Sequence, residues 1–588
     1  MSQRRERHKA LVYHSKPNPG KIKVVPTKSH QSQRDLSLAY SPGVAYPCLE
    51  INENPDDVYK YTSKSNLVAV ISNGTAVLGL GDIGPLASKP VMEGKGLLFK
   101  IFADIDVFDI EVDTNNIEEF IQTVKNISPT FGGINLEDIK APDAFEIERR
   151  LVEELDIPVM HDDQHGTAII SGAALINALE IADKKINEVK MVICGAGAAA
   201  ISCGKIYKAL GVKAENIIMF DSKGPLNEKR DNLTSEKKDF ISNRNDVESL
   251  SDAVKNSDIF IGLSKSNMLT AEMLKTMALN PIVFAMANPD PEISYQLAIS
   301  TRDDIIMATG RSDHPNQVNN VLGFPFIFRG ALDVKASKIN EEMKMAAVHA
   351  LAKLAKEPVP EYVNIAYGEK KLAFGRDYII PKPFDQRLIT TVPLAVARAA
   401  ISSGVAREKI EDWDKYENEL ASRLGNNNKI TRLLISKAKN NPKRIVYPEA
   451  DKLDVIKAAQ IVHEEGIGIP ILLGNRERIE KMRSEIEYEN EVEIIDLSES
   501  KHDKIKDKYA KTFVELRKHK GLSFKKARQL MNYRNYFGCM MVKQGSADAF
   551  ISGYSRSYPE VIKPVLKIIG KEDGVRKVAA TNLMITSK

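Results

Sequence analysis

The sequence predicts an α/β protein with several domains. At 588 residues the chain is too long for one hydrophobic core. Between residues 190 and 309 short apolar runs alternate with helical segments, which indicates a parallel sheet that helices bury on both faces. A second region of the same kind begins near residue 444. Hydrophobic residues make up 43% of the chain and charged residues 28%, which is ordinary for a soluble globular protein.

Composition and charge exclude several classes of protein. The net charge of +4 is small for this length and gives no reason to expect a nucleic-acid partner. No run approaches the roughly 18 apolar residues that cross a membrane, so we expect no membrane partner. The basic residues 1–9 are not followed by the apolar run of a secretory signal. The four cysteines are scattered without C-x-x-C spacing, which favours a reduced, cytoplasmic location over a disulfide framework.

The first 160 residues contain two isolated residues of interest and one predicted turn. Asn73-Gly74 separates two apolar runs, at 67–72 and 75–80, and so predicts a β-hairpin, because Asn-Gly adopts the positive φ angles of a tight turn. Lys95 lies between two glycines in an apolar run, as either a surface lysine or a desolvated catalytic amine. Tyr40 precedes a Pro-Gly turn, where a tyrosine is more often a packing residue.

A glycine-rich loop follows the predicted strand 190–194 and opens the predicted helix 198–210. Such a loop lets a pyrophosphate approach the helix N-terminus closely. In this strand–loop–helix setting the pattern indicates a dinucleotide-binding domain. The residues expected on the dinucleotide are Gly195, Ala196, Gly197, Ala198 and Ala199. Asp221, at the end of the next strand, would bind the ribose hydroxyls and favour NAD, whereas Ser222 and Lys223 could hold a 2′-phosphate, so the cofactor stays open.

Two acidic pairs, Glu137-Asp138 and Asp162-Asp163, each follow a short apolar run. Carboxylates gathered without cysteine suit a hard cation such as Mg²⁺ or Mn²⁺. The alternative is that both pairs are solvated turn residues or helix caps. His161 and His165 have the spacing of the zinc-protease motif H-E-x-x-H. That motif requires glutamate at its second position, where this chain has aspartate, so we interpret the histidines as structural partners of the acids.

Two amides follow the last strands of the predicted parallel sheet. Asn288 lies in an Asn-Pro turn and Asn320 follows Asn319. Either side chain could orient a carboxylate substrate, but Asn before Pro is also a common turn former. Both interpretations stay open from the residues alone.

The C-terminal part reads as a separate region behind a linker. A polar stretch ending in three asparagines predicts a linker over residues 406–429. Strand, helix and strand then alternate again from residue 444, and the last predicted strand covers residues 578–586.

Several of these segments together resemble bacterial malic enzymes. They are LAYSPGVA, GLGDIGP, VMEGKGLLFKIFADID, GGINLEDI, PVMHDDQHGTA, GAGAAA, FAMANPDPE and TGRSDHPNQVNN, and they span most of residues 30–330. Residues 430–588 resemble the N-terminal part of a phosphotransacetylase domain. The expected organisation is a substrate and metal domain (1–163), a Rossmann-type NAD(P) domain with C-terminal helices (164–405), the linker (406–429) and an incomplete phosphotransacetylase-like domain (430–588).

The resemblance implies oxidative decarboxylation of L-malate to pyruvate and CO2, with NADP or NAD as oxidant. It implies Tyr40 as general acid, Lys95 as general base, Asp162 in acid–base support and Glu137, Asp138 and Asp163 as ligands of Mg²⁺ or Mn²⁺. Asn288 and Asn320 would contact malate, and Asn288 would also reach the dinucleotide. A homo-oligomer is expected, with acetyl-CoA as a possible effector of a non-catalytic C-terminal domain. The alternatives are decarboxylation of another hydroxy acid, such as tartrate, or a scaffold protein with an inactive site.

Overall fold

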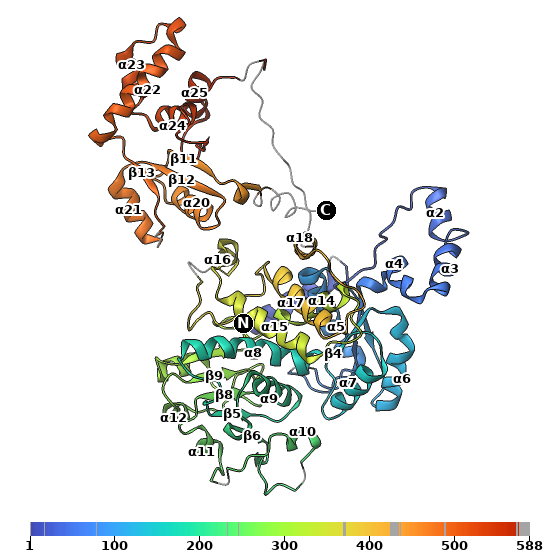
Figure 1. Ribbon diagram of the computed structural model, residues 1–588. Coiled ribbons are helices and arrows are strands. Elements are labelled where there is room, and N and C mark those ends of the chain that lie inside the picture. The colour runs from blue at the N-terminus through green and yellow to red at the C-terminus, as the bar shows by residue number, and fades with distance from the viewer. Residues whose placement is uncertain are drawn as a thin grey trace. The chain divides into compact units, whose positions relative to one another are not determined.

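The computed structural model describes residues 2–571, except 17, 78, 232, 245, 368–371, 424–433, 435–436, 487 and 489, and also residues 574 and 575. The chain divides into two compact units, Met1–Leu424 and Gly425–Lys588 (Figure 1). None of the described helices is long and apolar enough to span a bilayer. The predicted strand at 578–586 lies outside the described residues.

A parallel sheet of four strands in the order β2-β1-β3-β4 organises the first part of the larger unit. β1, β3 and β4 are buried along their whole length, as expected for a parallel sheet covered on both faces. The strands are β1 (Leu67–Ser72), β2 (Asp106–Glu111), β3 (Gly133–Leu136) and β4 (Val159–His161). The helices of this part are α1 (Ser2–Ser15), α2 (Gln33–Ala39), α3 (Ala45–Glu53), α4 (Val58–Tyr61), α5 (Gly84–Ala103), α6 (Ile117–Ile127) and α7 (Asp143–Glu154).

The hairpin predicted at Asn73-Gly74 is wrong. β1 pairs in parallel with β2 and β3, and the segment after the turn contributes only an isolated bridge between Val77 and Gly81. Gly74 has the positive φ of +68° that the prediction required. The backbone nitrogens of Ile83 and Gly84 both donate to its carbonyl oxygen, so the turn leads the chain into α5 and not into a second strand.

A sheet of six strands in the order β10-β9-β8-β5-β6-β7 forms the second part of the larger unit, and only β7 is antiparallel. This confirms the predicted parallel sheet and its Rossmann-like topology. The chain leaves β5 for β6 on one side and returns to β8 on the other, so β5 and β8 flank the switch point where such sheets bind ligands. The strands are β5 (Met191–Cys194), β6 (Ile217–Asp221), β7 (Gly224–Pro225), β8 (Ile259–Gly262), β9 (Ile282–Ala285) and β10 (Ile306–Thr309).

Helices of the second part pack on this sheet and on one another, with α8 (Asp162–Ile181) as the central one (Figure 1). Its small residues, such as Gly172 and Ala173, are buried and allow close packing against α9 (Ala198–Leu210). The remaining helices are α10 (Ser235–Lys238), α11 (Leu250–Val254), α12 (Ala271–Thr276), α13 (Tyr295–Thr301), α14 (Phe324–Asp333), α15 (Glu341–Ala355), α16 (Glu361–Tyr367), α17 (Leu388–Ser402) and α18 (Trp413–Ser422).

Up to Ser422, the segment predicted as a linker is part of the folded larger unit. It contains α18, which packs on α17 and buries Tyr416 and Leu420. The Tyr416 hydroxyl donates to Asp333 on α14, and Arg398 of α17 lies 3.9 Å from the ring centroid of Trp413. The polar composition that suggested a linker belongs to the outer face of this helix.

The smaller unit has its own parallel sheet, in the order β13-β12-β11-β14. Its strands are β11 (Lys443–Tyr447), β12 (Gly468–Leu473), β13 (Glu493–Ile495) and β14 (Ala549–Phe550). Its helices are α20 (Leu453–Glu464), α21 (Arg476–Glu485), α22 (Asp503–Leu516), α23 (Phe524–Leu530), α24 (Arg534–Lys543) and α25 (Tyr558–Ile568).

Candidate functional site

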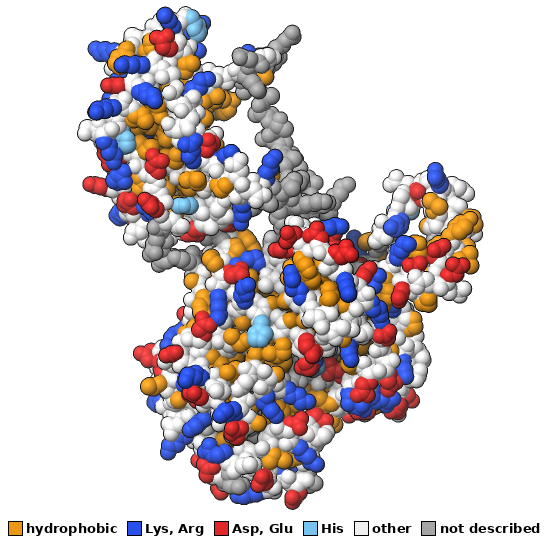
Figure 2. Space-filling view, in the orientation of Figure 1, with side chains coloured by type: hydrophobic (Ala, Val, Ile, Leu, Met, Phe, Trp, Pro, Cys, Tyr) orange, Lys and Arg blue, Asp and Glu red, His pale blue; other side chains and the backbone are white. Residues whose placement is uncertain are grey.

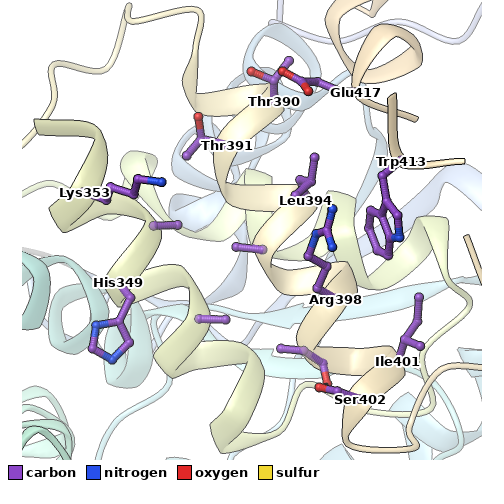
Figure 3. Close-up of a pocket in the computed structure, with 14 residues that line it drawn as sticks. His349, Lys353, Thr390, Thr391, Leu394, Arg398, Ile401, Ser402, Trp413 and Glu417 are labelled. Atoms are coloured by element: carbon purple, nitrogen blue, oxygen red, sulfur yellow. The ribbon is translucent and has the colours of Figure 1, made fainter. Parts of the chain in front are cut away.

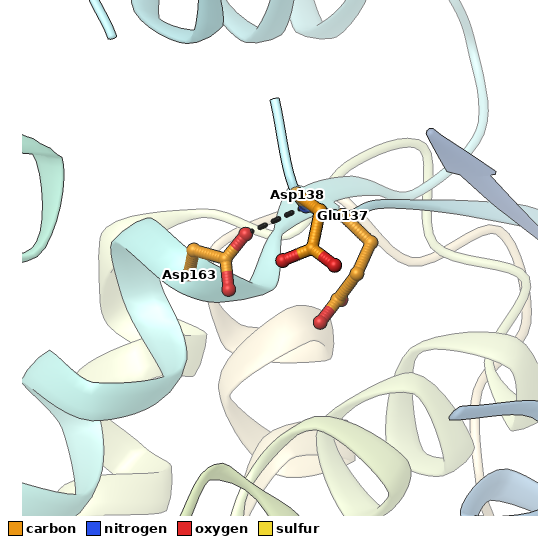
Figure 4. A group of neighbouring side chains, drawn as sticks. All are labelled: Glu137, Asp138 and Asp163. Atoms are coloured by element: carbon orange, nitrogen blue, oxygen red, sulfur yellow. Dashed lines mark hydrogen bonds between the residues drawn. The ribbon is translucent and has the colours of Figure 1, made fainter. Parts of the chain in front are cut away.

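Both acidic pairs converge where β3 ends and α8 begins. Glu137 and Asp138 directly follow β3, and Asp162 and Asp163 are the first residues of α8, directly after β4. Because β3 and β4 are parallel neighbours, their carboxyl ends bring the pairs together. Ligand oxygens of Glu137, Asp138 and Asp163 lie within 4.8 Å of one another, and the three carboxylates face a common point (Figure 4).

This acid cluster consists of Glu137, Asp138, Asp162 and Asp163. The first three are at most 4% exposed, whereas the Asp163 side chain is 40% exposed. Asp138 Oδ2 and Asp162 Oδ1 are buried and have no hydrogen-bond partner in the part of the chain that the structure describes. Burial raises the pKa of Asp138 to about 7, and the Asp163 charge adds to this rise. Burial likewise raises the pKa of Glu137 well above its usual value. Buried carboxylates with free lone pairs fit a hard divalent cation, which would neutralise them, so the chain provides a candidate Mg²⁺ or Mn²⁺ site.

Lys95 reaches this cluster from α5 and is 9% exposed, so the interpretation as a surface lysine is wrong. Its Nζ lies 2.6 Å from Asp162 Oδ2, 2.7 Å from Glu137 Oε1 and 4.3 Å from the ring centroid of Phe324. Burial lowers the pKa of Lys95, but the carboxylates of Asp162 and Glu137 raise it by more than burial lowers it. The pKa of Lys95 therefore lies above the usual range. The lowered pKa that desolvation alone would give a catalytic amine is therefore not found in the chain without a cation.

Asn320, at the start of the 3-10 turn Asn320–Leu322, bonds the first turns of α8 at the acid cluster. Its Nδ2 donates to Asp162 Oδ2 at 3.1 Å, and Thr167 Oγ1 donates to its Oδ1 at 2.9 Å. Gly166 leaves room for this contact, because a Cβ there would come within 2.2 Å of Asp162 Oδ1. Asn320 therefore positions Asp162, and its contact with malate stays a prediction.

The two histidines lie beside the acid cluster and are not among the grouped ligand atoms. His165 Nε2 lies 3.0 Å from Glu148 Oε2, and Lys344 Nζ lies 3.2 Å from His165 Nδ1. Glu148 Oε1 accepts the backbone N–H of His161. Despite burial, His165 and Lys344 lower the pKa of Glu148 to about 2.

Glu148 was not anticipated from the sequence, although one signal was present. It shares the buried face of α7 with Ala144, Ile147 and Leu151. A carboxylate on the apolar face of an amphipathic helix requires a partner. That spacing alone could have predicted that Glu148 binds a basic group from another element.

The loop between β5 and α9 has the geometry expected for a pyrophosphate site. Gly195 has φ of +131°, and a Cβ there would lie 2.4 Å from the carbonyl oxygen of Leu263. Gly197 has open space where a Cβ would point and caps α9 without a side-chain bond. Ala198 and Ala199 form the first turn of α9, with Ala196 between the glycines. The uncapped N-terminus of α9 is therefore available to an anion.

Two further predicted residues lie at carboxyl ends of the same sheet. Asp221 ends β6, and the N–H of Gly195 donates to the carbonyl of Phe220 beside it. Asn288 follows β9 in a cis Asn288-Pro289 peptide, and its side chain lies next to Gly310 at the end of β10. The parallel sheet thus gathers the glycine loop, Asp221 and Asn288 along one edge, as predicted.

Tyr40 is not brought to Lys95 within this chain. Tyr40 is the C-cap residue of α2 and is 78% exposed. Figure 1 shows α2 and α3 standing away from α5 and the rest of the larger unit. The role of Tyr40 as general acid therefore stays a prediction.

A separate open groove lies between α15, α17 and α18 (Figure 3). Apolar side chains such as Leu394 line it together with His349, and Lys353 and Arg398 supply positive charge. Glu417 is the one carboxylate among its lining residues, so the groove has no set of cation ligands like the acid cluster.

The chain matches three protein families along its length. "Malic enzyme, N-terminal domain" matches residues 19–152, "Malic enzyme, NAD binding domain" residues 164–366, and "Phosphate acetyl/butaryl transferase" residues 429–588.

Full-length relatives and solved structures agree with these matches. An NADP-dependent malic enzyme of Escherichia coli is 49% identical over 98% of this chain and 76% of the relative. An NAD-dependent malic enzyme of Rhizobium meliloti is 47% identical over 98% of the chain and 76% of the relative. A crystal structure of malic enzyme from Pyrococcus horikoshii is 42% identical, covers 74% of this chain and 98% of its own, and superposes with a TM-score of 0.66. With its acid cluster, buried lysine and dinucleotide loop, the chain belongs to the malic enzyme family and carries a phosphate acetyl/butaryl transferase domain at its C-terminus.

Proposed function

We propose that the chain oxidatively decarboxylates L-malate to pyruvate and CO2, with NADP or NAD as oxidant and Mg²⁺ or Mn²⁺ as metal. The observation that carries this proposal is the acid cluster, with unpartnered carboxylate oxygens beside the Lys95 amine. Asn320, which begins the 3-10 turn Asn320–Leu322, donates to Asp162 beside this cluster. The relatives named as malic enzymes, both NADP- and NAD-dependent, support the same reaction.

The residues of the chain divide the work as follows. Glu137, Asp138 and Asp163 would hold the cation, which would supply Lewis acidity to the substrate oxygens. Lys95 would first pass its own proton to Asp162, which it contacts directly, and its neutral amine would then take the proton of the C2 hydroxyl. Asn288 and Asn320 orient the carboxylates of malate. The cation's charge would also offset the carboxylates that keep the pKa of Lys95 high.

The test is the initial rate of cofactor reduction by the full chain with L-malate and Mn²⁺. NADP and NAD are compared, and tartrate is offered as a second hydroxy acid. We expect turnover with malate and not with tartrate, and loss of turnover when a chelator removes the metal. Absence of malate-dependent reduction with either cofactor would refute the proposal.

For Tyr40 to act as general acid, a second copy of the chain would have to bring it to the acid cluster. The helices α2 and α3, which we call the arm, expose large apolar side chains, and Figure 2 shows hydrophobic side chains on its outer face. They are Leu36, Leu38, Tyr40, Val44, Tyr46 and Leu49. An exposed apolar surface of this kind marks a contact site. We therefore propose a homo-oligomer in which the arm of one copy covers another copy and brings Tyr40 to its acid cluster.

Mixing two inactive variants tests this arrangement. Tyr40→Phe removes only the proposed acid, and Lys95→Ala removes only the base. If the site takes the two residues from different copies, mixed oligomers regain part of the activity that each variant lacks. Lack of recovery in oligomers shown to be mixed would contradict the shared site.

We also propose a regulatory or oligomer-forming role for the C-terminal unit, with acetyl-CoA as a possible effector. This role is supported by the loop after β14, in which residues 552–555 donate hydrogen bonds to one carboxylate. Ser552, Gly553, Tyr554 and Ser555 all donate to Glu449. Because these donors are already engaged, we expect no acetyl transfer between acetyl phosphate and CoA, and measurable turnover by the full chain would contradict this.

For the location we propose the cytoplasm. All four cysteines are free, and three of them are buried. Disulfides form and persist mainly in oxidising compartments, so unpaired cysteines favour a reducing one.

A further inference from the structure

Glu148 of α7 holds the start of α8 at two points. Its Oε1 accepts the backbone N–H of His161, the residue directly before α8, at 2.9 Å. The same oxygen lies 2.9 Å from Nε2 of His165, one turn farther along the helix. The other oxygen, Oε2, lies 3.0 Å from the same Nε2. One carboxylate therefore contacts both ends of the first turn of α8, residues 161–165.

Lys344 of α15 determines which nitrogen of the His165 ring donates. The Nζ of Lys344 lies 3.2 Å from His165 Nδ1, the nearer of the two ring nitrogens. An ammonium group can only donate, so Nδ1 accepts this bond and Nε2 carries the ring proton that Glu148 accepts. Glu148 is 9% exposed and Lys344 is 6% exposed, so water competes little for these bonds. The contact between His165 and Glu148 is therefore buried and oriented.

The rotation of this first turn about the helix axis decides where Asp163 points. Successive residues of an α-helix project about 100° apart, so a small rotation moves a side chain to a different face. Gln164 Nε2 donates to the carbonyl oxygen of Ala144 on α7 at 3.3 Å. Asp163 Oδ2 accepts the backbone N–H of Asp138, which follows β3, at 2.8 Å. Contacts to α7 through Glu148 and Gln164 thus hold the turn in the rotation that brings Asp163 to Asp138.

Packing of α7 does not account for a carboxylate at position 148. An apolar side chain there would join Ile147 and Leu151 on the buried face of α7 without the free-energy cost of burying a charge. It would leave the N–H of His161 without an acceptor and the ring of His165 without its partner. The carboxylate of Glu148 therefore serves the orientation of α8.

We propose that Glu148 is a positioning residue for the metal site. Through His161 and His165 it fixes the rotation of the first turn of α8, and this rotation directs Asp163 toward the end of β3. Glu148 is not among the grouped ligand atoms, so its effect on a cation passes through Asp163. This inference rests on the proposed function, whose metal site it deepens.

The test compares two conservative variants, for which orientation and charge predict opposite orders of Mn²⁺ affinity. Glu148→Gln loses the charge but keeps the length of the side chain and an oxygen that can accept both bonds. Glu148→Asp keeps the charge but is one methylene shorter, so it loses at least one of the two contacts. We expect Glu148→Asp to weaken Mn²⁺ binding by about 10- to 100-fold, as loss of an outer-shell partner does, and Glu148→Gln to weaken it less.

Mn²⁺ binding to the metal-free full chain is followed by the paramagnetic resonance signal of the free ion. Glu153→Ala is the matched control, because Glu153 lies on the same helix but is exposed and pairs with Arg149. It should leave Mn²⁺ affinity unchanged. Chemical denaturation of each variant separates affinity from stability. If Glu148 only stabilised the fold, its variants would unfold more easily, while the folded chains would bind Mn²⁺ as tightly as the unaltered chain.

Unchanged Mn²⁺ affinity of folded Glu148→Asp would therefore overturn the inference. Tighter binding by Glu148→Asp than by Glu148→Gln would also overturn it, because the charge at position 148 would then matter more than the geometry. Mn²⁺ binding needs neither malate nor dinucleotide, so this result is independent of the reaction. A chain that shows the expected order of affinities but does not oxidise malate would refute the proposed function and leave the positioning role of Glu148 standing.

Discussion

Two buried carboxylate sites of this protein differ in how far the chain satisfies them. At the acid cluster, Lys95 is the one Lys or Arg among the described residues that contacts Glu137 and Asp162, and Asp138 Oδ2 has no hydrogen-bond partner among them. In the C-terminal unit, Glu449 accepts five hydrogen bonds from the loop of residues 552–555. Burial raises the pKa of Asp138 to about 7, whereas the bonds from the loop lower the pKa of Glu449 to about 2 in spite of burial.

The contrast separates a carboxylate that needs a ligand from one that does not. An unsatisfied buried carboxylate costs folding free energy, and a chain retains such a group where a cation or substrate supplies the missing partner. A saturated carboxylate contributes to stability and leaves no lone pair for chemistry. Asp138 also has φ of +53°, a left-handed conformation that is sparsely populated and often found at functional sites.

The largest expected effect is on turnover. Lys95→Ala should lower kcat for malate oxidation by about 10²–10⁴-fold, the usual contribution of a positioned acid–base group. The cofactor affinity should stay unchanged, because Lys95 lies at the acid cluster and away from the glycine loop. Steady-state kinetics at saturating Mn²⁺ measures this, and unchanged turnover would remove Lys95 from the reaction.

The next effect concerns the metal. Asp163→Asn removes one charged ligand and should raise the Mn²⁺ concentration for half-maximal turnover by about 100-fold, since even loss of an outer-shell partner costs about 10- to 100-fold. Asp162→Asn is the matched control, because Asp162 is its neighbour but bonds Lys95 and Asn320. It should lower turnover with a smaller change in metal requirement. Equal metal requirement in the two variants would contradict the ligand assignment.

Removing the Glu449 carboxylate should lower stability and leave catalysis unchanged. Glu449→Ala leaves the backbone N–H groups of Gly553, Tyr554 and Ser555 without their acceptor. We expect the free energy of unfolding of the C-terminal unit to fall by about 2–4 kcal/mol, with malate turnover unchanged. Chemical denaturation with an assay of malate oxidation checks both parts. A loss of turnover in the folded variant would show that Glu449 has a role beyond stability.

The two sites should also depend on pH in opposite directions. The pKa of Asp138 is raised in the fold, so its ionisation costs stability as pH rises from about 4 to about 7. Asp138→Asn should therefore stabilise the metal-free chain more at pH 8 than at pH 5. The pKa of Glu449 is lowered, so its contribution is complete above its unfolded pKa of about 4.5 and is lost as pH falls toward 2. The cost of Glu449→Gln should shrink below pH 4, and parallel pH profiles would contradict the comparison.

Much of the fold follows from local patterns. The strands β5, β6, β8, β9 and β10 and the helix α9 lie where apolar runs and the glycine loop predicted them, because a buried parallel sheet requires continuous apolar strands. The hairpin at Asn73-Gly74 failed because pairing with β2 and β3 overrode a correct turn signal. Within the segment predicted as a linker, the part up to Ser422 is wrong because α18 is amphipathic and packs on α17 through few side chains, while the boundary between the two units lies farther along the same segment.

The sequence allowed several residues of the candidate site to be chosen, but not the hydrogen bonds between them. The two acidic pairs and Lys95 could be chosen from the sequence, because charged residues in apolar runs need a partner. The bonds that determine their behaviour join distant parts of the chain. They are the bonds from Lys95 to Asp162 and from Asn320 to Asp162. Such long-range contacts have no local sequence signal, and the separation of Tyr40 from Lys95 has none either.

The most direct test of the central claim is a titration of the metal-free full chain with Mn²⁺, in which the free ion is followed by its paramagnetic resonance signal. The claim is that Glu137, Asp138 and Asp163 form an unsatisfied site built for one divalent cation. We predict one bound Mn²⁺ per chain, which Asp163→Asn weakens strongly and Glu449→Gln leaves unchanged. No bound ion in the unaltered chain, or equal binding by the unaltered chain and Asp163→Asn, would contradict the account.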